Sequence, residues 1–300
     1  MSTPVASRKR RGNRIPLLAP LSFTIITMVL FVLFFVMPGG LGIYYAFTDY
    51  RGIGSAEWIG LENFVELFQD EDFYSALFRT LTYAVVVVPL GYVVSLLAAW
   101  LITSPRSKGI GVARVIFFLP WLVSPIVAGI VWRWLFGESF GLVNYLLSLI
   151  GIAPISWQSN ANLSLSVVVL AGIWGGMAFS MLLFAAALKN IPQSYYEAAS
   201  IDGASTWQQF WKITLPLLKP TSFMVVLLST IGAMKEFALI QALNGGGPGT
   251  QNNLMVQYIY STGFERAQIG YASAASVILM LLLLVIAGIQ MQFDKGAEYE

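Results

Sequence analysis

The residues with the most specific spacing in this chain lie in a polar stretch that contains the pattern E-A-A-x3-G-x9-I-x-L-P, with Gly203 as its glycine. Residues 194–197 and 205–208 each begin with Ser and end with Glu or Gln, the form of a capping box at the start of a helix. Glycine tolerates the left-handed backbone just past a helix end. The spacing therefore predicts a helix, a glycine turn and a second helix, which the prolines that close the stretch would stop.

A charged pair, Lys235 and Glu236, falls inside a segment that is otherwise apolar enough to lie in a bilayer. Such residues usually face the interior of a helix bundle or a water-filled path. Neighbours on a helix project about 100° apart, so the two side chains need not bond each other. One interpretation places them beside a substrate route together with Trp174. The other is a structural ion pair or a hydrogen bond to a second subunit, and the residues leave both open.

Little covalent chemistry is open to this chain, because it has no Cys and no His. Thiol nucleophiles, disulfides, histidine acid–base catalysis and most transition-metal sites are thereby excluded. The glycine run at residues 245–249 is not followed by Gly-Lys-Ser/Thr, so it is not a phosphate-binding loop. We expect no catalytic residue, no metal site and no cofactor. The few basic residues lie beside apolar segments, which argues against a nucleic-acid partner.

Composition places the chain in a membrane, since 57% of its 300 residues are hydrophobic and only 11% are charged. A span needs about 20 apolar residues. We predict an all-α protein with a basic segment at 1–14, a transmembrane domain at 15–293 and a short polar tail at 294–300. Pro38 should bend or end the first span. The six predicted spans lie at about 18–45, 80–104, 115–136, 164–188, 221–243 and 270–293.

Two polar connections have distinct expectations. The loop at 49–76 has apolar residues at helical spacing, which favours a short amphipathic helix at the membrane surface over a ligand site. The connection at 189–220 holds the helix–turn–helix pattern. Basic residues beside spans mark the cytoplasmic side, and they put this connection and both termini there. The residues that collect on that side are Arg8, Lys9, Arg10, Arg11, Arg14, Arg106, Lys108, Arg114, Lys189, Lys212, Lys219 and Lys295, against Arg51, Arg79, Arg133 and Arg266.

The pattern at 191–220 resembles the EAA loop of the membrane-spanning permeases of ABC importers. Softer matches over nearly the whole chain are similar to the permeases of carbohydrate importers of the maltose and glycerol-3-phosphate type. They lie at residues 58–64, 117–121, 132–136, 181–184, 245–248 and 258–260. In that family an Asp is often found where this chain has Ala238, whereas the acid here is Glu236.

The resemblance implies a type I ABC importer permease fold in the cell membrane, with a loop that docks on a cytoplasmic ATPase. The docking residues that it implies are Glu197, Ala198, Ala199, Asp202, Gly203, Ala204 and Phe210. The chain has no Walker A motif, so ATP hydrolysis would belong to another subunit.

The expected function is transport of a sugar or related polyhydroxylated solute by alternating access, without catalysis by this chain. The implied partners are an ATPase subunit dimer, a second homologous permease and an extracytoplasmic solute-binding protein. A first alternative keeps the machinery and carries another solute, such as a phosphodiester or a polyamine. A second is a membrane-embedded enzyme or a passive channel, which would need no docking loop.

Overall fold

The computed structural model describes residues 18–103 and 110–296, and within these ranges the regular structure is entirely helical. Three long apolar helices are α4 (Glu71–Thr103), α8 (Ala161–Asn190) and α15 (Ile269–Gly296). A fourth apolar span joins α1 (Leu18–Phe31), the π-helix η1 (Val32–Val36) and α2 (Met37–Tyr45). The basic segment at 1–14 and the cytoplasmic-side residues Arg106 and Lys108 lie outside the described residues.

Two further apolar segments are bent. Helix α5 (Ile110–Leu122) meets α6 (Pro125–Leu135) at 106°, and the segment Thr206–Leu217 meets α12 (Lys219–Met234) at 67°. Together with the four long helices they make up to six spans, if each bent pair crosses the membrane once. The expected third span at 115–136 is therefore not one straight helix. Ser124 is extended because it precedes Pro125, and Pro125 opens α6.

The predicted break at Pro38 is wrong. Pro38 lies in the first turn of α2, directly after the wider π-turn of η1, and the helix continues without interruption. A proline costs little at such a position because the irregular turn already lacks the regular hydrogen bond. The fifth predicted span does break, but elsewhere: α12 ends at Met234 and a short helix, α13 (Ala238–Leu243), begins four residues later.

The remaining helices are short. They are α3 (Glu62–Leu67), α7 (Leu142–Leu149), α9 (Gln193–Ile201), α10 (Thr206–Gln209), the π-helix η2 (Phe210–Thr214), α11 (Leu215–Leu217), α14 (Met255–Tyr260) and the π-helix η3 (Ser261–Glu265). Helix α3 confirms the short helix expected in the 49–76 loop, with Leu61, Val65 and Phe68 exposed. Helix α7 was not predicted, although Leu142, Tyr145, Leu146 and Leu149 recur at helical spacing on its exposed face.

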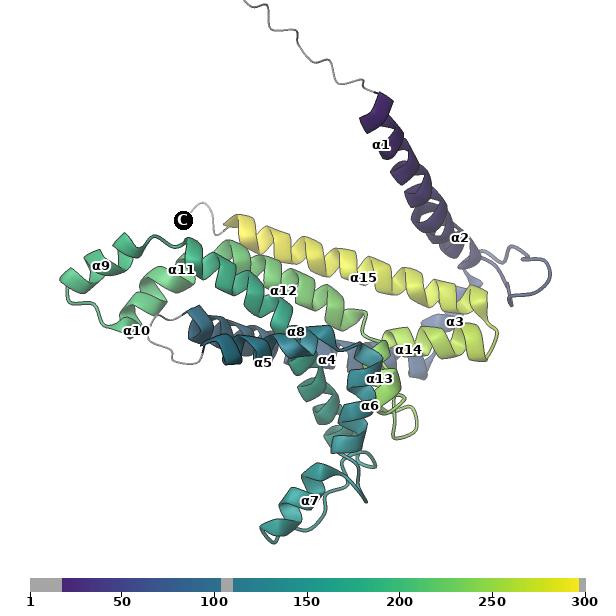
Figure 1. Cartoon of the computed structure of the whole chain (residues 1–300). Coiled ribbons are helices and arrows are strands. Elements are labelled where there is room, and N and C mark those ends of the chain that lie inside the picture. Colours follow the sequence, from purple (N-terminus) through teal and green to yellow (C-terminus); the bar gives the residue numbers. More distant parts are fainter. Residues whose placement is uncertain (1–17, 104–109, 297–300) are drawn as a thin grey trace, which may run out of the picture.

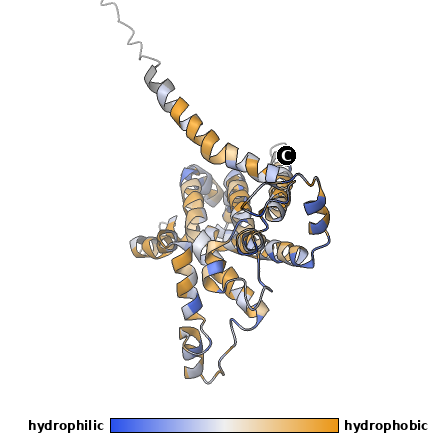
Figure 2. Ribbon diagram, turned by 90° about the vertical axis from the view of Figure 1, so that its right-hand side faces the viewer, coloured by the Kyte–Doolittle hydropathy of each residue, from blue (hydrophilic) through white to orange (hydrophobic). Residues whose placement is uncertain are grey.

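The buried core runs between α4 and α8, which pack along each other, with α12 across them and α6 against α13. Helix α1 stands apart from this core, whereas α2 meets α15 (Figures 1 and 2), and no residue from Thr24 to Tyr45 is buried. In Figure 1 the α9–α10 connection and the C-terminal end of α15 lie at one end of the molecule, and α3 and α14 lie at the opposite end. The long helices connect these two ends.

Close contact between α6 and α13 depends on Gly129. A Cβ at this position would lie 2.6 Å from the Leu239 carbonyl oxygen and 2.7 Å from the Ala242 Cβ. We expect Gly129→Ala to force the two helices apart and to lower the free energy of unfolding by about 1–3 kcal/mol. Thermal unfolding of the purified protein in detergent measures this. Gly288→Ala is the control, because a Cβ at Gly288 meets nothing within 4 Å, and equal melting of the two variants would contradict the packing argument.

Asp70 joins three elements at the α3–α14 end. Its Oδ1 accepts the backbone N–H groups of Asp72 (2.7 Å) and Phe73 (3.3 Å) at the start of α4. Its Oδ2 accepts the hydroxyls of Tyr258 (2.5 Å) on α14 and Tyr271 (3.0 Å) on α15. Partial burial raises the pKa of Asp70, but these hydrogen bonds outweigh it and leave the pKa below the ordinary value of 3.8.

We expect Asp70→Asn to destabilise the protein by about 1 kcal/mol at neutral pH, after allowance for solvent screening. A carboxylate with a depressed pKa stabilises the fold fully above its unfolded pKa and loses this effect as pH falls through the folded value. The difference between wild type and variant should therefore shrink below about pH 4. Melting curves at several pH values test this, with Asp72→Asn as the neighbouring control. A pH-independent difference would contradict the role of the charge.

Candidate docking loop and membrane cavity

The predicted first capping box of the loop is wrong. Helix α9 begins at Gln193, its N-cap is Pro192, and no side chain caps it. Proline holds a backbone angle that suits this position, with φ −60° and ψ 130° at Pro192, so the helix starts before Ser194 could cap it. Glu197 thus lies in the middle of α9, where its exposed side chain is available to a partner.

The glycine turn and the second capping box are confirmed. Helix α9 ends at Ile201, Asp202 is its C-cap, and Gly203 follows with φ +80°, while the Ala204 N–H donates to the Ala199 carbonyl at 2.9 Å. Ser205 Oγ accepts the Gln208 N–H at 3.3 Å, and Gln208 Oε1 accepts the Ser205 N–H at 2.8 Å. The sequence pattern therefore builds two helices around a left-handed glycine, as capping and turn chemistry predict.

The second helix ends between the two prolines, as expected, although neither proline is its last residue. Helix α10 continues through η2 into α11, where Pro216 occupies the first turn, and the chain bends only at Leu218. Pro220 then occupies the first turn of α12. Pro220 fits there because the first turn of a helix does not use the N–H that proline lacks, and Pro216 follows the π-turn of η2, which already lacks the regular hydrogen bond.

Side-chain hydrogen bonds hold α9 against the segment that follows it. Gln209 Nε2 donates to Ser200 Oγ at 2.9 Å, and the hydroxyls of Tyr196 and Thr214 are 2.8 Å apart. The first of these bonds is exposed and the second is partly buried. No sequence motif marked Tyr196 or Gln209, since their partners are distant along the chain.

The predicted docking residues divide between the two faces of the loop. The side exposed to solvent carries Glu197, Ala198, Asp202 and Gly203, whereas Ala199, Ala204 and Phe210 are half-buried. Two large apolar side chains that the pattern did not mark are also exposed: Ile201 is 86% exposed and Trp207 is 69% exposed. Exposed apolar side chains on a polar loop favour a protein contact there.

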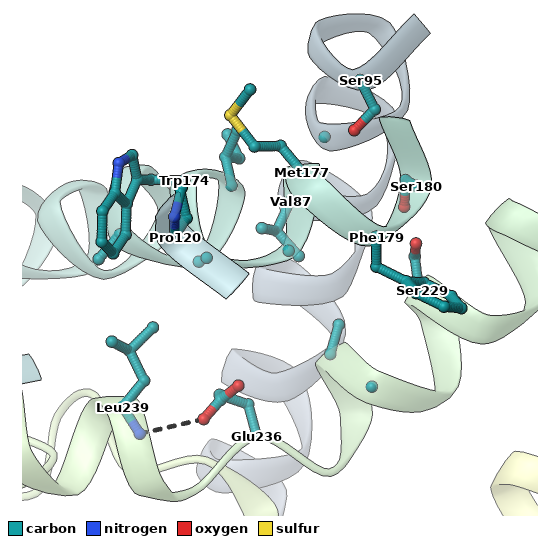
Figure 3. Close-up of a pocket in the computed structure, with 18 of the residues that line it drawn as sticks. Val87, Ser95, Pro120, Trp174, Met177, Phe179, Ser180, Ser229, Glu236 and Leu239 are labelled. Carbon is teal, nitrogen blue, oxygen red and sulfur yellow. Dashed lines mark hydrogen bonds between the residues drawn. The ribbon is translucent and has the colours of Figure 1, made fainter. Parts of the chain in front are cut away.

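A cavity of about 640 Å³ lies between α4, α8, α12 and the α5–α6 bend. Its wall includes Trp174 on α8 and Glu236 in the break after α12 (Figure 3). Lys235 is exposed and is not part of this wall. The structure thus brings two of the three predicted pathway residues together and separates the charged pair.

The break after α12 sets the position of Glu236. Phe237 is not helical (φ −141°, ψ −57°), so the first N–H groups of α13 have no partner in a preceding turn. Glu236 Oε1 accepts two of them, from Phe237 at 3.0 Å and from Leu239 at 3.1 Å. Figure 3 shows the second carboxylate oxygen directed away from Leu239. The carboxylate therefore caps α13 and still presents an acceptor to the cavity.

The rest of the cavity wall is apolar, aromatic or hydroxyl-bearing. Ser95, Ser180 and Ser229 contribute hydroxyls, and Trp121 and Tyr83 contribute aromatic rings. The Ser95 hydroxyl is buried and has no hydrogen-bond partner among the described residues. Within the described ranges no group of His, Cys, Asp and Glu is arranged to hold a metal ion. Such a wall suits binding of a solute rather than chemistry on it.

The apolar helices, the exposed helix–glycine–helix loop and the cavity together define a membrane transport component. Residues 91–299 match the family described as binding-protein-dependent transport system inner membrane component. The match covers more than half of the chain, so the chain belongs to this family. It is a multi-pass protein of the cytoplasmic membrane.

Curated relatives match along most of their length. The chain is 34% identical over 273 residues to the sn-glycerol-3-phosphate transport system permease protein UgpA of Yersinia pestis, which covers 89% of this chain and 91% of the relative. It is 38% identical to the probable ABC transporter permease protein YesP of Bacillus subtilis (94% and 92%). It is 35% identical to the trehalose/maltose transport system permease protein MalF of Thermococcus litoralis (87% and 88%).

A solved structure shows the same fold. It is that of a bacterial ABC transporter involved in the import of the acidic polysaccharide alginate, with a TM-score of 0.84 and 27% identity over 93% of this chain and 95% of the other. The chain is therefore a permease of the ABC importer class, as its EAA-like loop predicted.

Proposed function

We propose that this chain is the permease subunit of an ATP-driven importer that moves a sugar or related polyhydroxylated solute by alternating access. One observation carries the proposal: the two helices that flank the α9–α10 loop, α8 and α12, are also walls of the cavity. A force applied to the loop reaches the cavity through continuous helices. Nucleotide-driven movement of a docked ATPase would thus open or close the solute path.

The proposed orientation has six spans, with both termini and the 189–220 loop in the cytoplasm. It rests on the excess of Lys and Arg beside the spans on that side. The domain limits follow from it, with a basic segment at 1–14, the permease domain at 15–293 and a tail at 294–300. The last helix, α15, extends into that tail as far as Gly296.

The proposed ATPase contact is the exposed side of the loop. Glu197, Ala198, Asp202 and Gly203 would touch the ATPase subunit dimer, and Ala199, Ala204 and Phe210 would support α9 from behind. The absence of a Walker A motif in the sequence agrees with hydrolysis by that partner. Ile201 and Trp207 are exposed beside these residues and extend the same surface.

We propose two further partners, one outside the cytoplasm and one within the membrane. An extracytoplasmic solute-binding protein would deliver the cargo, as the family description implies. A second, homologous permease would complete the path and cover part of the exposed apolar surface. Lys235 could line the pathway or contact the second permease. Its exposure outside the cavity wall favours the contact with the second permease.

A sugar is the favoured cargo for two reasons. Two relatives are named for trehalose, maltose or a polysaccharide, and the cavity wall offers aromatic rings and hydroxyls. A phosphorylated cargo is the second candidate, since one relative is named for sn-glycerol-3-phosphate. A membrane-embedded enzyme or a passive channel fits neither the family nor the loop.

Reconstitution tests the proposed function. The chain, its partner permease, the ATPase dimer and the binding protein are placed in proteoliposomes, and uptake of the ligand that co-purifies with the binding protein is measured. We expect uptake only when ATP and the binding protein are both present. Uptake without either one would contradict the proposal, and so would ATP hydrolysis that never drives uptake.

Gly203 tests the docking loop. Its φ of +80° disfavours a β-branched side chain, although a Cβ there meets nothing within 4 Å. The effect of Gly203→Val should therefore come from backbone strain of about 1–2 kcal/mol, which changes the turn between α9 and α10. We expect membrane levels to persist while ATP hydrolysis is uncoupled from uptake.

Gly203→Asn is the matched control for this experiment, because Asn adopts the left-handed conformation more readily than other residues. It should retain most of the coupling. Normal coupled uptake by Gly203→Val would rule out the role proposed for the turn.

A further inference from the structure

We propose that Glu236 makes the cavity selective against anions, so that the cargo is a neutral polyhydroxylated solute. The inference rests on the proposed function and adds the charge class of the cargo to it. It assigns to Glu236 a specificity role that its helix-capping contacts alone would not require. It also separates this chain from relatives named for an anionic solute or an acidic polysaccharide.

The charges on the cavity wall support this assignment. Glu236 is the acidic residue of this wall, and no Lys or Arg is found among the wall residues that the structure describes. The neighbouring Lys235 is exposed and is not part of the wall, so it does not supply a counter-charge inside the cavity. An anionic solute in this space would therefore meet a carboxylate without a nearby cation, and repulsion is stronger where protein replaces water.

The carboxylate is fixed in place. Oε1 is held by the N–H groups of Phe237 (3.0 Å) and Leu239 (3.1 Å), so the side chain cannot turn out of the cavity without leaving α13 uncapped. Oε2 makes no hydrogen bond within the part of the chain that the structure describes. It is an acceptor without a protein partner on the wall of a solute-sized cavity.

A neutral polyol satisfies this wall better than an anion does. Its hydroxyls can donate to Glu236 Oε2 and can bond the hydroxyl of Ser229, which is partly exposed on the same wall. The apolar faces of a sugar ring can pack on the indole of Trp174, which lies on the opposite side of the cavity in Figure 3.

The absence of cysteine from the sequence permits a direct measurement of the cavity's charge. Ser229→Cys places one thiol on the cavity wall, seven residues before Glu236. In the full importer complex, the thiol is treated with two methanethiosulfonates of similar size, one carrying a trimethylammonium group and the other a sulfonate. The ratio of their reaction rates reports the local potential.

We expect the cationic reagent to be favoured, with a ratio about tenfold higher in Ser229→Cys than in Ser229→Cys with Glu236→Gln. Glutamine keeps an oxygen that can accept the two N–H groups of α13, so this variant removes charge while it preserves the cap. Ser148→Cys on the exposed side of α7 is the control, and its ratio should not respond to Glu236→Gln. Equal rate ratios in Ser229→Cys and in Ser229→Cys with Glu236→Gln would overturn the proposal.

Uptake distinguishes failure of this inference from failure of the proposed function. The wild-type complex should transport its cargo with ATP. It should not take up sn-glycerol-3-phosphate, even when a binding protein for sn-glycerol-3-phosphate is supplied. Uptake of sn-glycerol-3-phosphate by the wild type would overturn the charge selectivity while the importer function stands. Failure of every solute to enter would contradict the importer function, whereas the thiol rates would still report the charge of the cavity.

Discussion

Backbone N–H and C=O groups inside a bilayer have no water to bind, so each must find a partner within the protein. This constraint makes the described chain helical, and it also determines where the helices can be interrupted. The breaks near Ser124 and between Met234 and Ala238 both lie against the cavity. Glu236 meets the backbone requirement at the second break, where it accepts two N–H groups of α13. The helix cap and the candidate solute contact are thus the same side chain.

The same interrupted helix connects the cavity to the loop. Helix α12 begins after the bend at Leu218 and ends beside Glu236, while α8 carries Trp174 and leads directly into α9. Hydrogen bonds of Gln209 and Tyr196 hold α9 to the segment before α12. A rigid loop between two helices that line the same cavity is a direct physical route for coupling. This route does not require an additional chain of contacts through the core.

Much of the fold could be predicted from hydropathy and turn chemistry. The long spans are uniformly apolar over more than 18 residues, and Gly203 with the Ser205 capping box defines a turn through strictly local hydrogen bonds. Prolines were less informative, because their effect depends on the hydrogen bonds of the neighbouring turn. Pro38 lies within a continuous helix, the helix that contains Pro216 ends one residue later, and Pro125 accompanies a bend of 106°. The start of α9 at Gln193 shows the same limit of prediction from local sequence, since Pro192 occupies the N-cap position that was predicted for Ser194.

The sequence by itself determined the membrane class, the loop pattern and the presence of a charged pair within an apolar stretch, because these depend on composition and short-range spacing. Only the tertiary structure decided which member of the pair faces the cavity. The segment from Met234 to Ala238 contains neither Gly nor Pro, so nothing local predicts that α12 ends there. Beyond this end α13 packs against α6, Glu236 lies on the cavity wall and Lys235 is exposed outside it.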